Sequence, residues 1–306
     1  MYSKERKLIK QNIRKEEQRL TQTQQALTKQ VKSAYYNFQF GHAKLALYQR
    51  LDSVFSNYKE AATLRYKTGD ISTLEKLSST SQYHDIQTRL KSVQSDLHTY
   101  HQELQQWLNT EDSLAINNAQ LEPLEPSSKP DTGMVGQNPE FKLNQQSVKT
   151  AEARHQREQA NLWPQLEFTY QDQRVQSVPG FYGFMVGLNV PLDFWTYDGR
   201  NQAAKLKIKQ RKAHLARVKN RIQSKLQQKW QQYKKYQEQV QYYQNQRLEQ
   251  ADKLMGNAIK QYKNGSITYP AYAQYVEQAI EIKVDYLNKL RNLNQSVVEL
   301  EYLVGE

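Results

Sequence analysis

The hexapeptide Tyr66-Lys67-Thr68-Gly69-Asp70-Ile71 recurs as Tyr262-Lys263-Asn264-Gly265-Ser266-Ile267, at an offset of 196 residues. The same ungapped offset pairs further identical residues, namely Lys29 with Lys225, Ala62 with Ala258, Leu97 with Leu293 and Leu104 with Leu300. A match that continues at one offset without gaps predicts that the chain contains one structural unit twice.

The composition favours long helices over a compact globule. Of the 306 residues, 38% are hydrophobic, and the mean hydropathy is −0.93. Such values are typical of helices that bury only a narrow apolar seam. No run of eighteen apolar residues is present, so no membrane-spanning helix is predicted. The chain has no cysteine, which excludes disulfides, thiolate metal sites, a cysteine nucleophile and a lipidated cysteine on this chain.

The formal net charge of +12 has two interpretations. A strongly basic chain can bind an anionic neighbour such as nucleic acid or phosphorylated lipid. Lysine-rich helices can also carry the same charge on a solvated surface. We favour the solvated surface, because we interpret the charged residues as scattered along the sequence rather than clustered.

The first repeat, residues 1–110, is predicted to be a long helical hairpin with its tip at 66–71. Residues 2–40 contain neither Gly nor Pro, and apolar residues recur at helical spacing as far as Ala62. This pattern predicts a helix from about residue 4 to 68. Gly69 suits the left-handed position that ends a helix. Ser72 and Glu75 form a capping-box pattern that begins a second helix, ending near Asn109.

Residues 111–137 are predicted to be a linker with little regular structure, since Pro and Gly recur among polar residues. The second repeat, residues 138–306, begins with Asn138-Pro139-Glu140. An Asn cap, a Pro at the first helical position and an acid in the first turn together predict a helix start. This helix is expected to span 138–162 and to end before Pro164.

Residues 165–171 and 182–192 alternate between apolar and polar or small side chains on either side of a polar turn, which predicts a β-hairpin over 164–193. One face is expected to carry Leu166, Phe168, Tyr170, Tyr182, Phe184, Val186, Leu188 and Val190. Each strand has about ten residues, enough to cross a bilayer at a tilt. The pattern is typical of a transmembrane strand that faces lipid on one side and water on the other. The alternative is a soluble hairpin packed on a helix. We favour the membrane, because so continuous an apolar face is unusual among glutamine-rich helices.

A second long helical hairpin is predicted over residues 200–304, with its tip at 262–268. Gly265 ends the first helix, Thr268 can cap the returning helix, and Pro270 fits its first turn. The repeat offset maps Arg200 onto Lys4. We therefore expect that the first helix and first β-hairpin of the natural unit are missing from this sequence. The alternative is that the first repeat never had a hairpin.

The order of these signals resembles the TolC-like outer-membrane efflux channel family, the outer membrane factors of tripartite efflux systems. The residues that carry the resemblance are Asn138 to Glu140, Trp163-Pro164, Val190-Pro191-Leu192, Asp198-Gly199-Arg200 with mid-helix Trp230, and Tyr262-x-x-Gly265. The resemblance implies a mainly α fold with one β-hairpin and two internal repeats. Its long antiparallel coiled-coil hairpins would form an α-barrel, and its transmembrane strands would contribute to a β-barrel.

The resemblance also implies a function and partners. The chain would be a homotrimeric, passive exit duct in the outer membrane of a Gram-negative cell, with a helical extension into the periplasm. A periplasmic adaptor protein would join it to an inner-membrane efflux pump that drives the cargo. The adaptor would contact the tips, residues Tyr66, Lys67, Thr68, Gly69, Asp70, Ile71, Tyr262, Lys263, Asn264, Gly265, Ser266 and Ile267. Outer-membrane lipid would contact the apolar face of the hairpin.

No catalytic constellation is found. His98 and His101 share a helix face, and they are weak metal candidates without a third ligand. The favoured interpretation of this pair is a solvated polar face. The sequence has no HExxH motif, phosphate-binding loop or dinucleotide fingerprint. We therefore expect neither an enzyme nor a cofactor.

A second function stays open at the level of sequence. The chain could be a soluble, basic coiled-coil interaction protein that binds nucleic acid or another anionic surface, with binding that weakens as salt rises. The apolar face of residues 164–193 argues against it, and no nucleic-acid partner is expected.

Overall fold

The computed structural model describes residues 2–115, 121–127, 129, 132–161, 163–175, 178–190 and 194–306. The chain divides into two compact units. Unit 1 comprises residues 1–25, 131–224 and 305, and unit 2 comprises residues 26–130, 225–304 and 306. Each unit therefore contains helices from both repeats.

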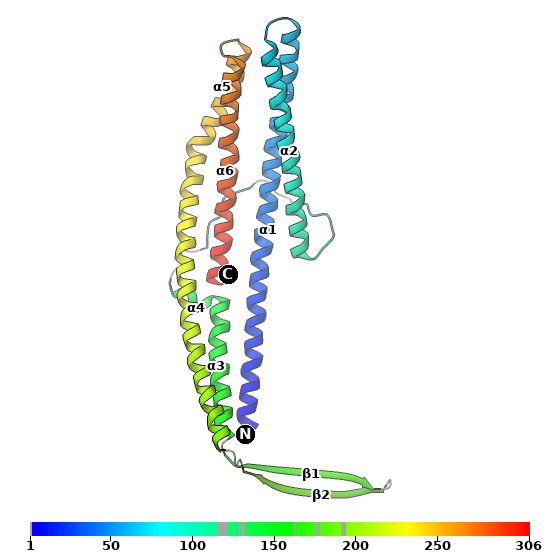
Figure 1. The fold of residues 1–306 in the computed structure, drawn as a ribbon, viewed down its shortest axis with the longest axis vertical. Helices are drawn as coiled ribbons and strands as arrows, with labels where there is room; N and C mark the ends of the chain where they lie inside the picture. The colour runs from blue at the N-terminus through cyan, green and yellow to red at the C-terminus, as the bar shows by residue number, and fades with distance from the viewer. Residues whose placement is uncertain are drawn as a thin grey trace. The chain divides into compact units, whose positions relative to one another are not determined.

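The described chain is mainly helical, with one antiparallel strand pair (Figure 1). The elements are α1 (Tyr2–Lys67), α2 (Thr73–Leu108), the 3₁₀ helix η1 (Thr132–Gln137), α3 (Pro139–Ala160), β1 (Gln165–Val175), β2 (Val178–Asn189), α4 (Phe194–Tyr242), the π-helical turn η2 (Tyr243–Arg247), α5 (Leu248–Lys263) and α6 (Tyr269–Val304). Among the described helices, none has a stretch long and apolar enough to span a membrane.

The predicted helix ends are confirmed where local chemistry specifies them. Gly69 and Gly265 have φ values of 81° and 71°, a conformation that a Cβ atom would strain. The Ser72 side chain accepts a hydrogen bond from the Glu75 backbone N–H at 3.2 Å. The Asn138 side chain accepts hydrogen bonds from the N–H groups of Glu140 at 2.9 Å and Phe141 at 3.2 Å.

Two segments are more regular than predicted. The last residues of the predicted linker form η1, because Val135 is buried against Val218 and Ile222 of α4 and this packing orders the turn. The long helix expected from residue 200 already begins at Phe194. A hydrogen bond from Gln202 to Asp198 supports this earlier start, and a glycine within a helix costs only about 1 kcal/mol.

The long helix of the second repeat is also not continuous, since η2 separates α4 from α5. A π turn inserts an extra residue and so changes which later side chains face the partner helix. Tyr243 and Gln244 of this turn bond the α6 side chains Asp285 and Tyr286, at 3.4 and 3.1 Å. The π turn thus forms hydrogen bonds between the long helix and α6.

In unit 1, α3 pairs with the first turns of α1 and with the first half of α4. The Gln146 side chain donates to Gln11 at 2.7 Å, and Arg157 forms an ion pair with Glu5. On the other side, Lys212 lies 3.0 Å from Glu152. The seams combine these polar contacts with buried apolar residues, among them Leu8, Val148 and Ala153.

In unit 2, the two helical hairpins share one core. It contains Tyr48, Leu51, Phe55 and Tyr58 of α1, Ile86 and Val93 of α2, Ala258 and Tyr262 of α5, and Tyr269, Tyr272, Ala273, Val276 and Ile280 of α6. The end of this core nearest the tips is a cluster of tyrosine rings. Tyr58 stacks on Tyr272 with centroids 4.2 Å apart, and Tyr262 stacks on Tyr272 at 5.2 Å. Tyr269 donates from its hydroxyl to Gln82 of α2 at 2.7 Å.

Burial raises the pKa of all four tyrosines in this cluster, Tyr58, Tyr262, Tyr269 and Tyr272, above the usual value. The cause is desolvation, which disfavours the phenolate. Neighbouring tyrosines and, for Tyr262, Glu75 add to the effect. The folded state therefore retains these protons at a pH at which the unfolded chain loses them.

We predict that alkaline pH weakens unit 2 through these tyrosines. An exposed tyrosine ionises near pH 10. Below pH 10 the tyrosines contribute their full stabilisation to the folded state. Above pH 10 the folded state binds more protons than the unfolded state. The free energy of unfolding then falls by roughly 1.4 kcal/mol per pH unit for each such tyrosine. Urea unfolding between pH 8 and 11.5 measures the slope.

The Tyr272→Phe variant should lose stability less steeply than the wild type above pH 10. Tyr66→Phe, which removes the same hydroxyl from an exposed ring, should follow the wild type. Equal slopes for Tyr272→Phe and wild type would contradict the assignment.

Candidate functional site

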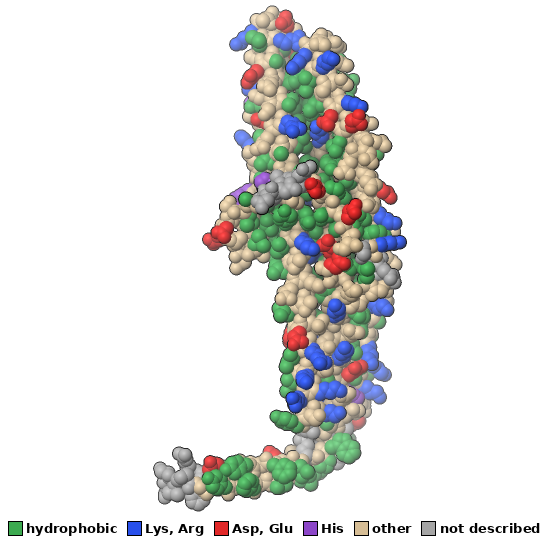
Figure 2. Space-filling model, turned by 180° about the vertical axis from the view of Figure 1, so that it is seen from behind, with side chains coloured by type: hydrophobic (Ala, Val, Ile, Leu, Met, Phe, Trp, Pro, Cys, Tyr) green, Lys and Arg blue, Asp and Glu red, His purple; other side chains and the backbone are tan. Residues whose placement is uncertain are grey.

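The β1–β2 hairpin presents an apolar face that the described chain leaves uncovered. The register pairs Leu166 with Leu188, Phe168 with Val186 and Tyr170 with Phe184, so that apolar side chains lie opposite one another. The predicted set, Leu166, Phe168, Tyr170, Tyr182, Phe184, Val186, Leu188 and Val190, is exposed throughout, and Phe184 reaches 83%. Figure 2 shows these hydrophobic side chains continuing along the strands.

The opposite face of the hairpin is polar or small apart from Met185. Its cross-strand pairs are Glu167 with Gly187, Thr169 with Met185, and Gln171 with Gly183. The two faces therefore differ in polarity over most of the described ladder, with Asp172 paired with Tyr182 as the polar exception on the apolar face. Contiguous exposed apolar surface of this kind marks a site of contact with another apolar phase or protein.

Two tryptophans flank the hairpin. Trp163 precedes β1 and is 73% exposed, and Trp195 lies in the first turn of α4 and is 86% exposed. Exposed tryptophan is costly in water and is enriched at the boundary between hydrocarbon and lipid headgroups. Both therefore lie along the chain where a membrane-spanning hairpin would leave the bilayer.

The two predicted tips are alike in backbone and differ in side-chain burial. Tyr66 is 38% exposed, whereas Tyr262 is 5% exposed and packs in the tyrosine cluster. The exposed tip surface consists of Tyr66, Lys67, Thr68, Gly69, Asp70, Lys263, Asn264, Gly265 and Ser266, with Ile71 and Ile267 partly buried. The ring of Tyr262 is thus a packing group in this structure.

Glu75 joins the two tips. Its carboxylate accepts a hydrogen bond at 3.2 Å from the backbone N–H of Tyr269, in the first turn of α6. The capping-box pattern assigned this carboxylate to the start of its own helix. Instead, it satisfies an unpaired donor at the start of the other hairpin, where the helix dipole favours negative charge.

The N-terminal part of α1 carries an exposed apolar stripe. Ile9, Ile13, Leu20 and Leu27 recur at intervals of four and seven and are all exposed. At about 100° per residue, they lie on one face of the helix. A seam of this spacing is typical of a helix that packs along a second helix.

The histidine pair is not brought into a metal site. The His101 ring accepts a hydrogen bond from the Leu114 N–H at 3.3 Å and lies 5.4 Å from the Phe38 ring, while His98 is exposed. Burial and the nearby His101 lower the pKa of His42. Within the described residues, no group of three or more His, Asp or Glu side chains is placed to hold a metal ion.

A concentration of positive charge was missed at the level of sequence. Residues 199–237 contain no Asp or Glu, and their basic residues are Arg200, Lys205, Lys207, Lys209, Arg211, Lys212, Arg217, Lys219, Arg221, Lys225, Lys229, Lys234 and Lys235. The interpretation that the charges are scattered is therefore wrong. The absence of acids over these residues was the signal that could have found it. Figure 2 shows Lys and Arg side chains gathered on the helices adjoining the hairpin.

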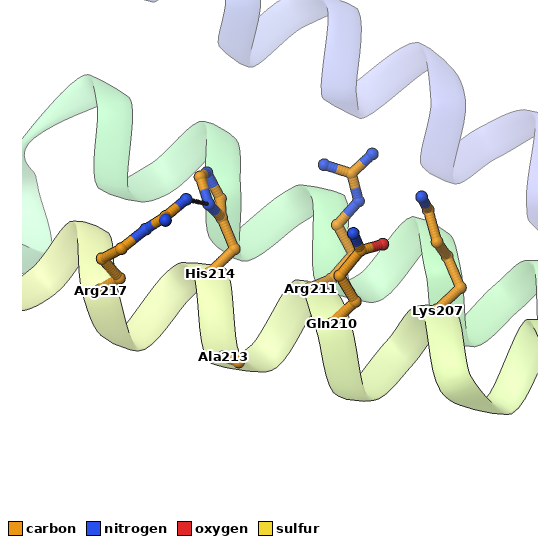
Figure 3. Close-up of a pocket in the computed structure, with 6 residues that line it drawn as sticks. All are labelled: Lys207, Gln210, Arg211, Ala213, His214 and Arg217. Atoms are coloured by element: carbon orange, nitrogen blue, oxygen red, sulfur yellow. Dashed lines mark hydrogen bonds between the residues drawn. The ribbon is translucent and has the colours of Figure 1, made fainter.

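Some of these residues line a groove among α1, α3 and α4 in unit 1, which has a volume of about 260 Å³. Its charged lining residues are Lys15, Arg154, Arg157, Lys207 and Arg211, and no acid lines it. We call these five residues and the space between them the basic groove. In Figure 3, Lys207 and Arg211 extend from α4 to the side on which α3 and α1 lie.

Comparisons with known proteins bear on the fold. No protein-family model matches the sequence, and no curated protein sequence does. A membrane protein from Pseudomonas aeruginosa has a TM-score of 0.86 at 12% identity, over 98% of this chain and 70% of that chain. The CmeC outer membrane channel of Campylobacter jejuni has a TM-score of 0.85 at 12% identity, over 99% of this chain and 67% of that chain.

The outer membrane protein VceC from Vibrio cholerae gives a TM-score of 0.82 at 13% identity, over 100% of this chain and 76% of that chain. Similarity at such identities establishes the fold. The expected class, long helical hairpins with one antiparallel strand pair in the arrangement of the TolC-like outer-membrane channels, is the fold of this chain.

Proposed function

We propose that the protein is an outer-membrane channel of a Gram-negative efflux system, acting as a passive exit duct without chemistry on its cargo. The observation that carries this proposal is the uncovered apolar face of β1–β2, flanked by Trp163 and Trp195. The similarity to the Campylobacter jejuni outer membrane channel and the Vibrio cholerae outer membrane protein supports the same location.

The chemistry of the hairpin fits lipid on one side and water on the other. Burying eight large apolar side chains in hydrocarbon removes the cost of their exposure to water, at about 25 cal/mol per Å². The strands have 11 and 12 residues, enough to cross the hydrocarbon layer at a tilt. The opposite face, with Thr169 and Gln171, would line water or other polar surface.

Self-association follows from the same reasoning. A strand pair has two edges with unpaired backbone groups, which are not tolerated in hydrocarbon and must pair with further strands. The α1 stripe at Ile9, Ile13, Leu20 and Leu27 supports contact with a helix of another copy. A homotrimer with a helical extension into the periplasm would bring three such strand pairs and three such stripes together.

The tips would meet a periplasmic adaptor that connects the channel to an inner-membrane pump. Glycine turns place exposed polar groups of both repeats at the end of unit 2, at residues 66–70 and 263–266 (Figure 1). The contact surface would be exposed backbone and short side chains, together with the ring of Tyr66. Tyr262 would hold its tip in shape from within the core.

Protein extracted from expressing cells is expected to produce stepwise conductance in planar bilayers. Phe184→Arg should sharply reduce the frequency of insertion, since an arginine on the lipid face near mid-membrane costs roughly 2–4 kcal/mol. Gln171→Arg adds the same charge to the opposite face and should insert as the wild type does. Absence of conductance from folded, inserted wild type, or equal loss in both variants, would refute the proposal.

Leu20→Glu is expected to weaken self-association at least tenfold, because it places a charge in the α1 stripe. Thr21→Glu adds the same charge to the next exposed position, about 100° around the helix, and should leave association unchanged. Mass photometry in detergent over a dilution series measures the populations of one and three copies. A trimer that tolerates Leu20→Glu as well as Thr21→Glu would exclude the stripe as an interface.

A further inference from the structure

The basic groove has more positive charge than its surroundings neutralise. Arg157 forms ion pairs with Glu5 and Glu158, and Lys15 lies 3.7 Å from Glu16. Arg154, Lys207 and Arg211, in contrast, have no carboxylate within ion-pair distance among the described residues. Three of the five cations in the groove are therefore uncompensated.

The arrangement of these three cations is unfavourable without an anion. Lys207 and Arg211 are four residues apart on α4, where like charges repel by roughly 0.2–0.5 kcal/mol. Arg154 reaches the same space from α3. A ligand with two or more negative charges would relieve this repulsion and accept charge-assisted hydrogen bonds from two helices at once.

The groove extends in both directions along α4. One extension has a volume of about 520 Å³. Its charged lining residues are Arg154, Arg157, Arg200 and Lys207, together with one acid, Glu158, which lies 3.8 Å from Arg157. The other is lined by Lys207, Arg211, His214 and Arg217, with about 500 Å³ (Figure 3). In this second part, Arg217 lies 2.9 Å from the His214 ring nitrogen, and it forms no ion pair among the described residues. Volumes of this order suit small solutes.

Side chains of α1 and α4 meet over α3, the middle helix, which contributes the small residues Ser147, Thr150 and Ala151. For cargo to meet the groove, this side of unit 1 must face the bore of the proposed channel.

We propose that the basic groove binds small soluble anions with at least two negative charges, as phosphate or paired carboxylate groups, and that the cargo of this channel includes such anions. The claim about cargo rests on the proposed function, and the claim that the basic groove binds anions does not. The occupant is a small solute rather than a membrane lipid, because Lys207 lies about 18 Å beyond Trp195 along α4 at 1.5 Å per residue. That exceeds the depth of a headgroup layer.

The test is calorimetric titration of the whole chain, in neutral detergent at low salt, with inorganic pyrophosphate as the probe. The K207Q/R211Q variant removes two uncompensated cations. K205Q/K209Q is the matched control, with the same spacing and charge change on the opposite side of α4. All four residues are exposed, so both variants should fold. Wild type and K205Q/K209Q should bind alike, and K207Q/R211Q should bind at least tenfold more weakly.

R154Q should weaken binding as well, because it removes the cation supplied by α3. Absence of pyrophosphate binding, or equal loss in K207Q/R211Q and K205Q/K209Q, would overturn the proposal. So would displacement of pyrophosphate by phosphatidylglycerol in the micelles, which would make the groove a lipid site. Tighter groove-dependent binding of a DNA duplex would overturn it in favour of a nucleic-acid surface.

Reversal potentials in a salt gradient then test the link to transport. The wild type and K205Q/K209Q should favour anions, and K207Q/R211Q should shift toward cations. A conducting protein without this difference would refute the clause on cargo. A chain that binds pyrophosphate through the groove and never conducts would refute the channel and leave the binding site standing.

Discussion

Removal of the β1–β2 apolar face from water is the requirement on which the rest of the structure depends. Large side chains on both strands share this face, and within the described residues no helix of the chain covers them. The described helices pack against one another along narrow seams, and the apolar residues that they leave exposed, such as the α1 stripe, do not cover the strands. An outside phase or further chains must therefore cover the hairpin, and the account of location and assembly follows from that need.

Long helices with narrow apolar seams are stable because their contacts are distributed along the whole length of the helices. Unit 1 has a small apolar core around Val135, Val218 and Ile222, and polar contacts such as Gln146 with Gln11 supplement it. Unit 2 has the larger core, which ends in the tyrosine cluster beneath the tips. The Glu75 carboxylate at the start of α6 couples the two hairpins there. A rigid base beneath exposed polar turns is suited to holding a docking surface.

Local chemistry explains what could be predicted from the sequence. Gly69, Gly265, Ser72 and Asn138 specify helix ends through φ angles and caps that involve only a few neighbouring residues. The alternation along residues 166–188 specifies the strand faces in the same way. None of these features depends on a distant contact. The π turn at Tyr243–Arg247 has no comparable local signal, because its bonds go to α6.

Features that depend on distant partners could not be predicted. Tyr66 and Tyr262 occupy equivalent positions in a repeated hexapeptide, yet one is exposed and the other buried. The difference arises because α6 supplies Tyr269 and Tyr272, whereas the equivalent positions of the first repeat are Thr73 and Lys76. The basic groove likewise needs α1, α3 and α4 together. The repeat thus predicts the backbone, and the differences between its copies determine the surfaces.

The absence of cysteine permits a direct test of the central claim, since each introduced cysteine is unique. Spin labels placed one at a time at positions 166–172 and 182–188 in lipid vesicles can be compared for access to oxygen and to a water-soluble nickel complex. The account predicts alternation with a period of two, with oxygen favoured at 166, 168, 170, 182, 184, 186 and 188, and nickel favoured at the positions between. Uniform access to nickel, or uniform exclusion of both reagents, would contradict it.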